Sequence, residues 1–175
     1  YAKGRVSRCD LFQMDARNIP FENEFDVIGA FDVLEHINED EQVLSEMYRV
    51  VRPGGGIILT VPQHDFLWSQ RDEYACHVRR YSARGFEKKV QQAGFSVVRV
   101  TSFVSLLLPL LMLSRLRRRV PDKEYDPLVE FKIGKLTNWF LEKILGLERA
   151  LIRMGLSFPA GGSLLLIARK GTSKL

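Results

Sequence analysis

Two apolar stretches separated by a helical pattern constrain the fold of this chain more than any other feature. The first stretch, Phe25–Phe31, is apolar apart from one aspartate, as expected for a strand covered on both faces. Glu39–Val51 has apolar residues at helical spacing, and the following Pro53–Gly56 is expected to end that helix. Ile57–Val61 is again rich in β-forming residues. The order predicts a strand–helix–strand unit.

The flanking sequence extends this alternation. We expect a short strand over Val6–Met14, a helix that begins after Ser82 and ends at Gly94, and strands over Phe95–Val104 and Gly162–Arg169. A chain of 175 residues fits one domain with its own core. The sequence therefore predicts a single α/β domain, residues 1–175, with a largely parallel sheet.

An insert is expected between the last two strands, over residues 106–159. It opens with an apolar run, Leu106–Leu113, which is too short for a bilayer that needs about 20 apolar residues. Four arginines follow closely: Arg115, Arg117, Arg118 and Arg119. The chain has a net charge of +5, and this cluster indicates either a local patch for an anionic partner or a solvated turn.

The second half of the insert has the pattern of an amphipathic helix. Its apolar stripe consists of Val129, Ile133, Leu136, Phe140, Ile144, Leu147 and Leu151. Trp139 flanks the stripe. An apolar helix beside a basic cluster is typical of a membrane interface, and the alternative is a helical lid or a dimer surface.

The remaining composition gives few further indications. Cys9 and Cys76 lie far apart without metal-ligand spacing, so we expect neither a disulfide nor a zinc site, and a reducing cytoplasm is the default. The N-terminus, Tyr1–Arg5, has no signal peptide and no initiating Met, which suggests an incomplete chain. The basic cluster lacks interleaved aromatic residues, so no nucleic-acid partner is expected.

Three motifs together resemble the middle of a class I S-adenosylmethionine-dependent methyltransferase of the type 11, 12 or 23 kind. They are Asp15–Phe21 (DARNIPF), Gly29–Ile37 (GAFDVLEHI) and Arg49–Gly56 (RVVRPGGG). The resemblance covers about Val6–Val104 and the last strand. It implies a Rossmann-like three-layer sandwich with the helical insert before its last strand. The implied activity is transfer of a methyl group from S-adenosylmethionine.

The resemblance also implies cofactor-binding residues. The Asp15 carboxylate would accept a hydrogen bond from the adenine amine, and the Ala16 amide would donate to a ring nitrogen. Phe31, at the end of its strand, would line the methionine or adenosine part together with Asp32. Ligands of open α/β sheets bind outside the carboxyl ends of the strands.

The loop after Phe31 has two interpretations. It resembles a Glu-x-x-Glu-His run that ubiquinone-pathway O-methyltransferases use for a divalent metal, which would make Asp32, Glu35 and His36 the ligands. Alternatively, the Glu35-His36 pair favours the start of the next helix through its dipole. The second interpretation is preferred, and no metal is expected.

The loop after the fifth family strand resembles a bacterial subgroup with an Asp-x(4)-His-x-Arg-Arg-Tyr stretch near the transferred methyl group. His77 is the first candidate for a general base and His64 the second, because an imidazole accepts a proton near neutral pH. The expected substrate-binding residues are Trp68, Arg79, Arg80 and Tyr81. The two arginines suit an anionic acceptor, or else they brace the next helix.

The sequence lacks the family's glycine-rich loop and the acidic residue that binds the ribose, so we expect an incomplete methyltransferase domain. The expected acceptor is a small molecule or is linked to a lipid or saccharide, with peripheral membrane contact through the insert and with a homodimer left open. The alternative is an inactive methyltransferase-like binding or scaffold module at a membrane or partner surface.

Overall fold

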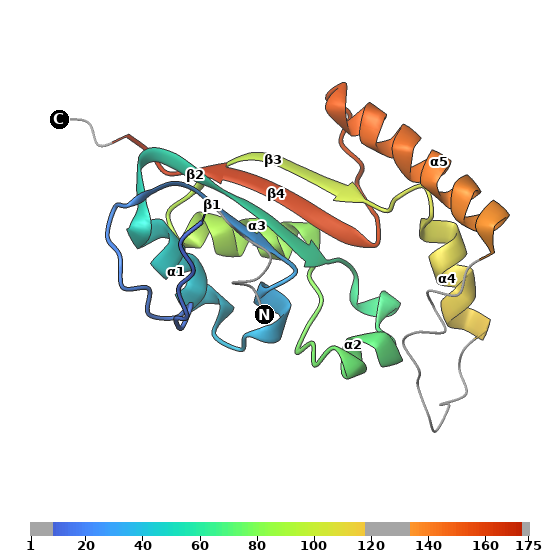
Figure 1. Cartoon of the computed structure of the whole chain (residues 1–175), viewed down its shortest axis with the longest axis horizontal. Helices are drawn as coiled ribbons and strands as arrows, with labels where there is room; N and C mark the ends of the chain where they lie inside the picture. Colours follow the sequence, from blue (N-terminus) through green and yellow to red (C-terminus); the bar gives the residue numbers. More distant parts are fainter. Residues whose placement is uncertain (1–8, 118–133, 173–175) are drawn as a thin grey trace.

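The computed structural model, which describes residues 9–117 and 134–172, contains a four-stranded sheet (Figure 1). Its strands are β1 (Phe25–Phe31), β2 (Val51–Pro62), β3 (Ser96–Phe103) and β4 (Ser163–Arg169), in the order β1-β2-β4-β3. β1 and β2 are parallel, whereas β4 runs antiparallel to both β2 and β3. The expectation of a largely parallel sheet is therefore wrong for the described strands, because the inserted β4 reverses two of their three pairings.

The predicted strand–helix–strand unit is confirmed. β1 leads through a short helix, η2 (Leu34–His36), into α1 (Asp40–Val50), and α1 passes directly into β2. The glycines expected to end the helix instead lie within β2. Gly54 has φ +83°, and a Cβ on Gly55 would lie 2.5 Å from the Asp26 carbonyl oxygen of β1, so glycine is needed where these strands meet.

α3 (Ala83–Gln92) begins and ends where the sequence predicts. The Ser82 hydroxyl caps it by accepting from the Gly85 amide at 3.1 Å, and Gly94 follows with φ +105°. Phe86 and Val90 on its inner face are fully buried.

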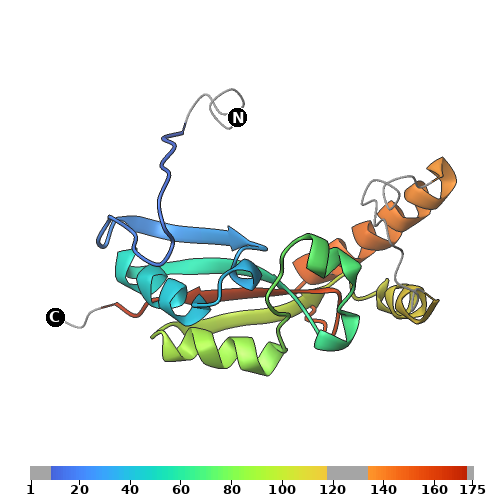
Figure 2. The same cartoon turned by 90° about the horizontal axis from the view of Figure 1, so that it is seen from below.

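α1 and α3 pack side by side on the same face of the sheet (Figure 2). Between these helices and the sheet lies the core: Val43, Leu44, Met47, Ile57, Leu59, Phe86, Val90, Leu164 and Leu166. This packing holds the carboxyl ends of β1 and β2 next to each other, since parallel neighbours end at the same edge of a sheet.

Two expectations about the first strands are wrong. Cys9–Met14, the described part of the predicted strand Val6–Met14, is not a strand. β1 is not covered on both faces, because Val27 is 58% exposed and Phe31 62% exposed. β1 is the edge of the sheet in the described residues, and the packed helices shield one face only.

The insert forms two helices, α4 (Leu108–Arg117) and α5 (Lys135–Arg153), which lie beyond the end of the sheet (Figure 1). α5 contains the predicted amphipathic pattern from Leu136 to Leu151, whereas Val129 and Ile133 lie outside the described residues. No helix in the described ranges is long and apolar enough to cross a bilayer.

Candidate active site at the carboxyl end of the sheet

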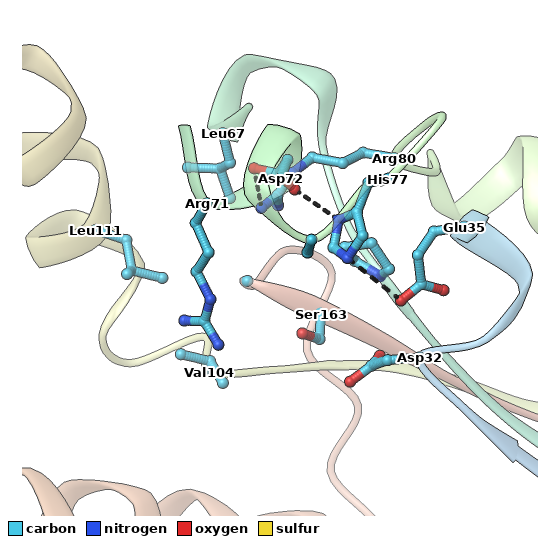
Figure 3. A pocket seen from close by; sticks show the side chains of 13 residues that line it. Asp32, Glu35, Leu67, Arg71, Asp72, His77, Arg80, Val104, Leu111 and Ser163 are labelled. Atoms are coloured by element: carbon cyan, nitrogen blue, oxygen red, sulfur yellow. Dashed lines mark hydrogen bonds and ion pairs between the residues drawn. The ribbon is translucent and has the colours of Figure 1, made fainter. Parts of the chain in front are cut away.

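A cavity of about 400 Å³ lies where the described strands meet the insert (Figure 3). Asp32 follows the end of β1, Pro62 ends β2, and Val104 follows the end of β3. The other walls come from α2 (Gln70–Tyr74) with the loop after it, and from Leu111 of α4. Its position fits the rule that ligands of α/β sheets bind outside the carboxyl ends of the strands, and its volume is typical of small-molecule sites.

Glu35 is the most unusual side chain in this cavity. It is fully buried, and neither carboxylate oxygen has a hydrogen-bond partner among the described residues. Burial, with a smaller contribution from the Asp32 carboxylate, raises the pKa of Glu35 to about 7. A buried carboxylate without partners holds its proton near neutral pH, or it accepts a hydrogen bond or a cation from outside the described structure.

His77 faces Glu35 across the cavity. Its Nε2 lies 4.0 Å from Glu35 Oε1, while its Nδ1 lies 2.9 Å from Asp72 Oδ1. An ionised Asp72 favours the tautomer in which Nδ1 carries the proton and donates it to this carboxylate. That tautomer leaves Nε2 as the proton acceptor on the cavity side.

Asp72 is held in place by groups around it. Arg80 donates to it from Nε at 2.8 Å and from Nη2 at 3.1 Å, and the Ser69 amide donates at 2.9 Å. Burial alone would raise the pKa of Asp72, but the hydrogen bonds from Arg80, His77 and Ser69 outweigh it and lower the pKa. Asp72 is therefore a fixed anion that orients His77.

The expected cofactor residues lie near the same end of the sheet. Phe31 presents an exposed ring at the end of β1, and Asp32 has φ +53° at the turn that follows. The loop with Asp15 and Ala16 lies beside the start of α1, because Arg17 pairs with Glu39 at 3.3 Å.

Asp15 itself is engaged with a neighbour. Arg17 donates to its carboxylate from the backbone amide at 2.9 Å and from Nη2 at 2.9 Å, and these contacts lower the pKa of Asp15. Both side chains are about half exposed, so the pair can separate at little cost. Ala16 packs partly buried against the core.

The other expected site residues lie outside the cavity wall. The His64 ring stacks on Phe66 with centroids 4.9 Å apart, and burial lowers the pKa of His64. Trp68 is 37% exposed and does not line the cavity.

Arg79 and Tyr81 make structural contacts. Arg79 pairs with Asp40 at 2.8 Å and donates to the Asn38 carbonyl at 2.9 Å, while the buried Tyr81 hydroxyl donates to Asp40 at 2.9 Å. Of the four expected substrate residues, the cavity wall includes only Arg80, and that guanidinium is engaged with Asp72.

Two side chains of the cavity wall, Glu35 and His77, lie close enough to the neighbouring His36 that the three could hold a metal ion. One ligand atom each from Glu35, His36 and His77 lies within 4.8 Å of the others. Asp32 is not part of this set, so the geometry differs from the Asp32, Glu35 and His36 alternative by exchanging Asp32 for His77. A carboxylate on the second nitrogen of a metal-binding histidine is the usual outer-shell arrangement, and Asp72 occupies that place.

Sequence reasoning did not assign roles to Glu35 as an isolated carboxylate or to Asp72 and Arg71. Asp72 could have been found, because it precedes His77 by five residues and Arg80 by eight within the motif that was recognised. The isolation of Glu35 depends on which groups fail to reach it, and no sequence pattern encodes that.

Comparison with known proteins identifies related sequences. A family model described as a methyltransferase domain matches residues 1–59. The ubiquinone/menaquinone biosynthesis C-methyltransferase UbiE of Pseudoalteromonas translucida is 33% identical over 76 residues, which are 41% of this chain and 30% of that protein. A protein of Mycolicibacterium smegmatis, named a probable S-adenosylmethionine-dependent methyltransferase, is 29% identical over 55% of this chain and 39% of its own length.

Solved structures share the fold. A SAM-dependent methyltransferase from Archaeoglobus fulgidus superposes with a TM-score of 0.55 at 15% identity, over 97% of this chain and 71% of that one. The [4+2]-cyclase SpnF has a TM-score of 0.56 at 20% identity, over 98% and 60%. The fold of this chain is thus the Rossmann-like fold of class I methyltransferases.

The sequence matches and the fold together relate this chain to the class I S-adenosylmethionine-dependent methyltransferases. The chain spans about a third of the length of the curated relatives it matches. The likeness to a cyclase shows that this fold alone does not determine the reaction.

Proposed function

We propose that the chain transfers a methyl group from S-adenosylmethionine to a small-molecule, lipid-linked or saccharide-linked acceptor bound in the cavity. The observation that carries the proposal is the Asp72–His77 pair, whose acceptor nitrogen faces a cavity at the carboxyl end of the sheet. The relationship to methyltransferases supports it independently.

The cofactor would supply a methyl group already activated on a sulfonium, so this chain's residues have to align and deprotonate the acceptor. Phe31, Asp32 and the loop of Asp15 and Ala16 would hold the adenosine and methionine parts. His77 Nε2 would take the proton of an acceptor hydroxyl, and Asp72 would stabilise the imidazolium that forms. Arg71 lines the cavity and adds a positive charge beside the acceptor.

A divalent cation at Glu35, His36 and His77 is a second candidate for this site, favoured by the partnerless oxygens of Glu35. With a cation bound, His77 would be one of its ligands and would not be available as a base. The cation would instead activate the acceptor oxygen as a Lewis acid. Titration of Mg²⁺, Mn²⁺ and Zn²⁺ by calorimetry separates the two, since binding that disappears in Glu35→Gln assigns the site to a metal.

The rival to catalysis is a methyltransferase-like module that binds a membrane or partner without transferring a methyl group. Calorimetric titration of S-adenosylhomocysteine into the chain discriminates between them. We expect binding that weakens about tenfold in Phe31→Ala, because an aromatic stacking contact is worth roughly 1–3 kcal/mol. Phe140→Ala, an equally exposed phenylalanine on α5, is the matched control. No binding, or equal weakening by both variants, would favour the module without catalysis.

A further inference from the structure

The insert exposes an unusual amount of apolar surface. Along α5, Leu136 is 80% exposed, and Trp139, Phe140 and Leu147 are each more than half exposed. α4 adds another group of exposed apolar side chains: Leu110, Met112 and Leu113. Exposed apolar side chains gathered on two helices in this number are typical of a binding surface.

The exposed charged side chains of α5 are mostly basic. Lys135, Lys143, Arg149 and Arg153 are all on its surface, against the single exposed acid Glu142. The Lys143 ammonium lies 5.7 Å from the centre of the Trp139 ring. In the sequence, residues 106–159 contain ten Lys and Arg and six Asp and Glu, which gives +4 of the chain's net +5. The surface therefore complements an anionic, apolar partner.

The C-terminal half of α5 is fixed to the body of the protein. Glu148 is buried and accepts from the amides of Ser105 and Leu106, both at 2.8 Å. Arg99 of β3 donates to the carbonyls of Ile152 and Leu156 at 2.9 and 2.7 Å. The first six residues of the helix, Lys135–Phe140, are exposed at every position. The helix is thus anchored at one end and presents its apolar and aromatic side chains at the other.

The insert also borders the cavity. Leu111 of α4 and Val104, which precedes α4, are part of the cavity wall (Figure 3). An amphiphile held at the surface of α4 could reach the cavity with its polar end while its chain stays on the insert. α4 thus contributes both exposed apolar side chains and part of the cavity wall.

We propose that α4 and α5 form a surface that docks on an anionic lipid bilayer, and that the acceptor is a membrane-borne amphiphile entering the cavity past Leu111. The acceptor part of this inference rests on the proposed methyl transfer, and the docking part does not. A lipid surface fits better than a folded protein because exposed Trp, Phe and Leu are interspersed with Lys and Arg on a projecting helix, the composition of interfacial helices. Basic side chains near anionic lipid each add about a fivefold gain in partitioning.

The test uses the whole chain and vesicles of phosphatidylglycerol or of phosphatidylcholine. Trp68→Phe leaves Trp139 as the only tryptophan. With phosphatidylglycerol vesicles, we expect the fluorescence emission of Trp139 to shift to the blue and to be quenched by brominated lipid. Both effects should be much smaller with phosphatidylcholine vesicles. In this background, Lys143→Gln with Arg149→Gln should weaken partitioning about 25-fold.

Loss of apolar contact is tested by Leu136→Ser with Phe140→Ser, which should abolish sedimentation with vesicles. Val98→Ser, at an equally exposed valine on β3, should leave it unchanged. Failure to bind either vesicle, or binding unaffected by the α5 variants, would overturn the proposal. Self-association in solution that disappears in Leu136→Ser would also overturn it, by assigning the surface to a second copy of the chain.

The two proposals can fail separately. Vesicle binding without S-adenosylhomocysteine binding would refute methyl transfer and leave the docking surface in place. Cofactor binding without vesicle binding would refute the docking surface alone.

Discussion

Replacing Glu35 by Gln should make the protein more stable at alkaline pH. The substitution keeps the shape of the side chain but removes its titrating proton. Because Glu35 is fully buried and its oxygens have no partners among the described residues, ionising it in the folded state is costly. The unfolded chain does not bear this cost.

The pKa of Glu35 determines the size of the effect. The folded value is about 7 and the ordinary value 4.5. Between these values the folded state holds a proton that the unfolded state has lost, so the free energy of unfolding falls as pH rises through this window. At 1.36 kcal/mol per pKa unit the full loss is about 3 kcal/mol, of which about 2.5 kcal/mol falls between pH 5 and pH 8.

Urea unfolding of the parent chain and of Glu35→Gln at a series of pH values measures this loss. Other groups titrate equally in both proteins, so the difference between the two curves isolates Glu35. From acid to alkaline pH, the free energy of unfolding of the variant should rise by about 3 kcal/mol relative to that of the parent. For a typical dependence on urea concentration, this is a difference of about 1.5 M in the urea midpoint. Parallel curves would refute the isolated-carboxylate argument. A gain that vanishes when divalent metal is added would show that a cation had stabilised the ionised form.

Two further substitutions test contacts outside the cavity. Glu148→Gln removes the charge that the Ser105 and Leu106 amides bind and replaces one acceptor oxygen by an NH₂ donor. It should lower the free energy of unfolding by about 3 kcal/mol in urea unfolding. The control, Glu142→Gln at an exposed position of α5, should have a negligible effect. Tyr81→Phe removes the buried hydroxyl that donates to Asp40 at 2.9 Å and should cost about 1–2 kcal/mol in the same measurement; an unchanged midpoint would contradict this structural role.

The helices and strands were largely predictable because their signals are local. Ser82 and Gly94 mark the ends of α3, and the structure confirms both. The direction of β4 was not predictable, because periodicity determines which residues form a strand but not which way it runs beside β2. The sequence Phe25–Phe31 also does not reveal how many faces of β1 are buried, since an apolar strand is buried only where other segments pack on it.

The candidate site was predictable only in part, for a related reason. His77 and Arg80 were expected from their motif and both line the cavity, whereas Arg79 and Tyr81 of the same motif turn toward Asp40 instead. Arg80 contacts Asp72 while its two neighbours contact Asp40, so a run of promising residue types divides between the cavity and the interior. The structure was needed to separate them.

Asp40 and Asp72 illustrate how the segment of Arg79 and Arg80 serves both stability and chemistry. Each aspartate is buried and pairs with one of the two arginines: Asp40 with Arg79 and Asp72 with Arg80. The pair at Asp40 ties the segment to the start of α1, and the pair at Asp72 ties it to α2. Because His77 bonds to an aspartate that Arg80 and Ser69 already hold in place, the tautomer of His77 is set without any acceptor. In the proposed methyl transfer, such preorganisation would make a single histidine sufficient, because the methyl donor is already activated.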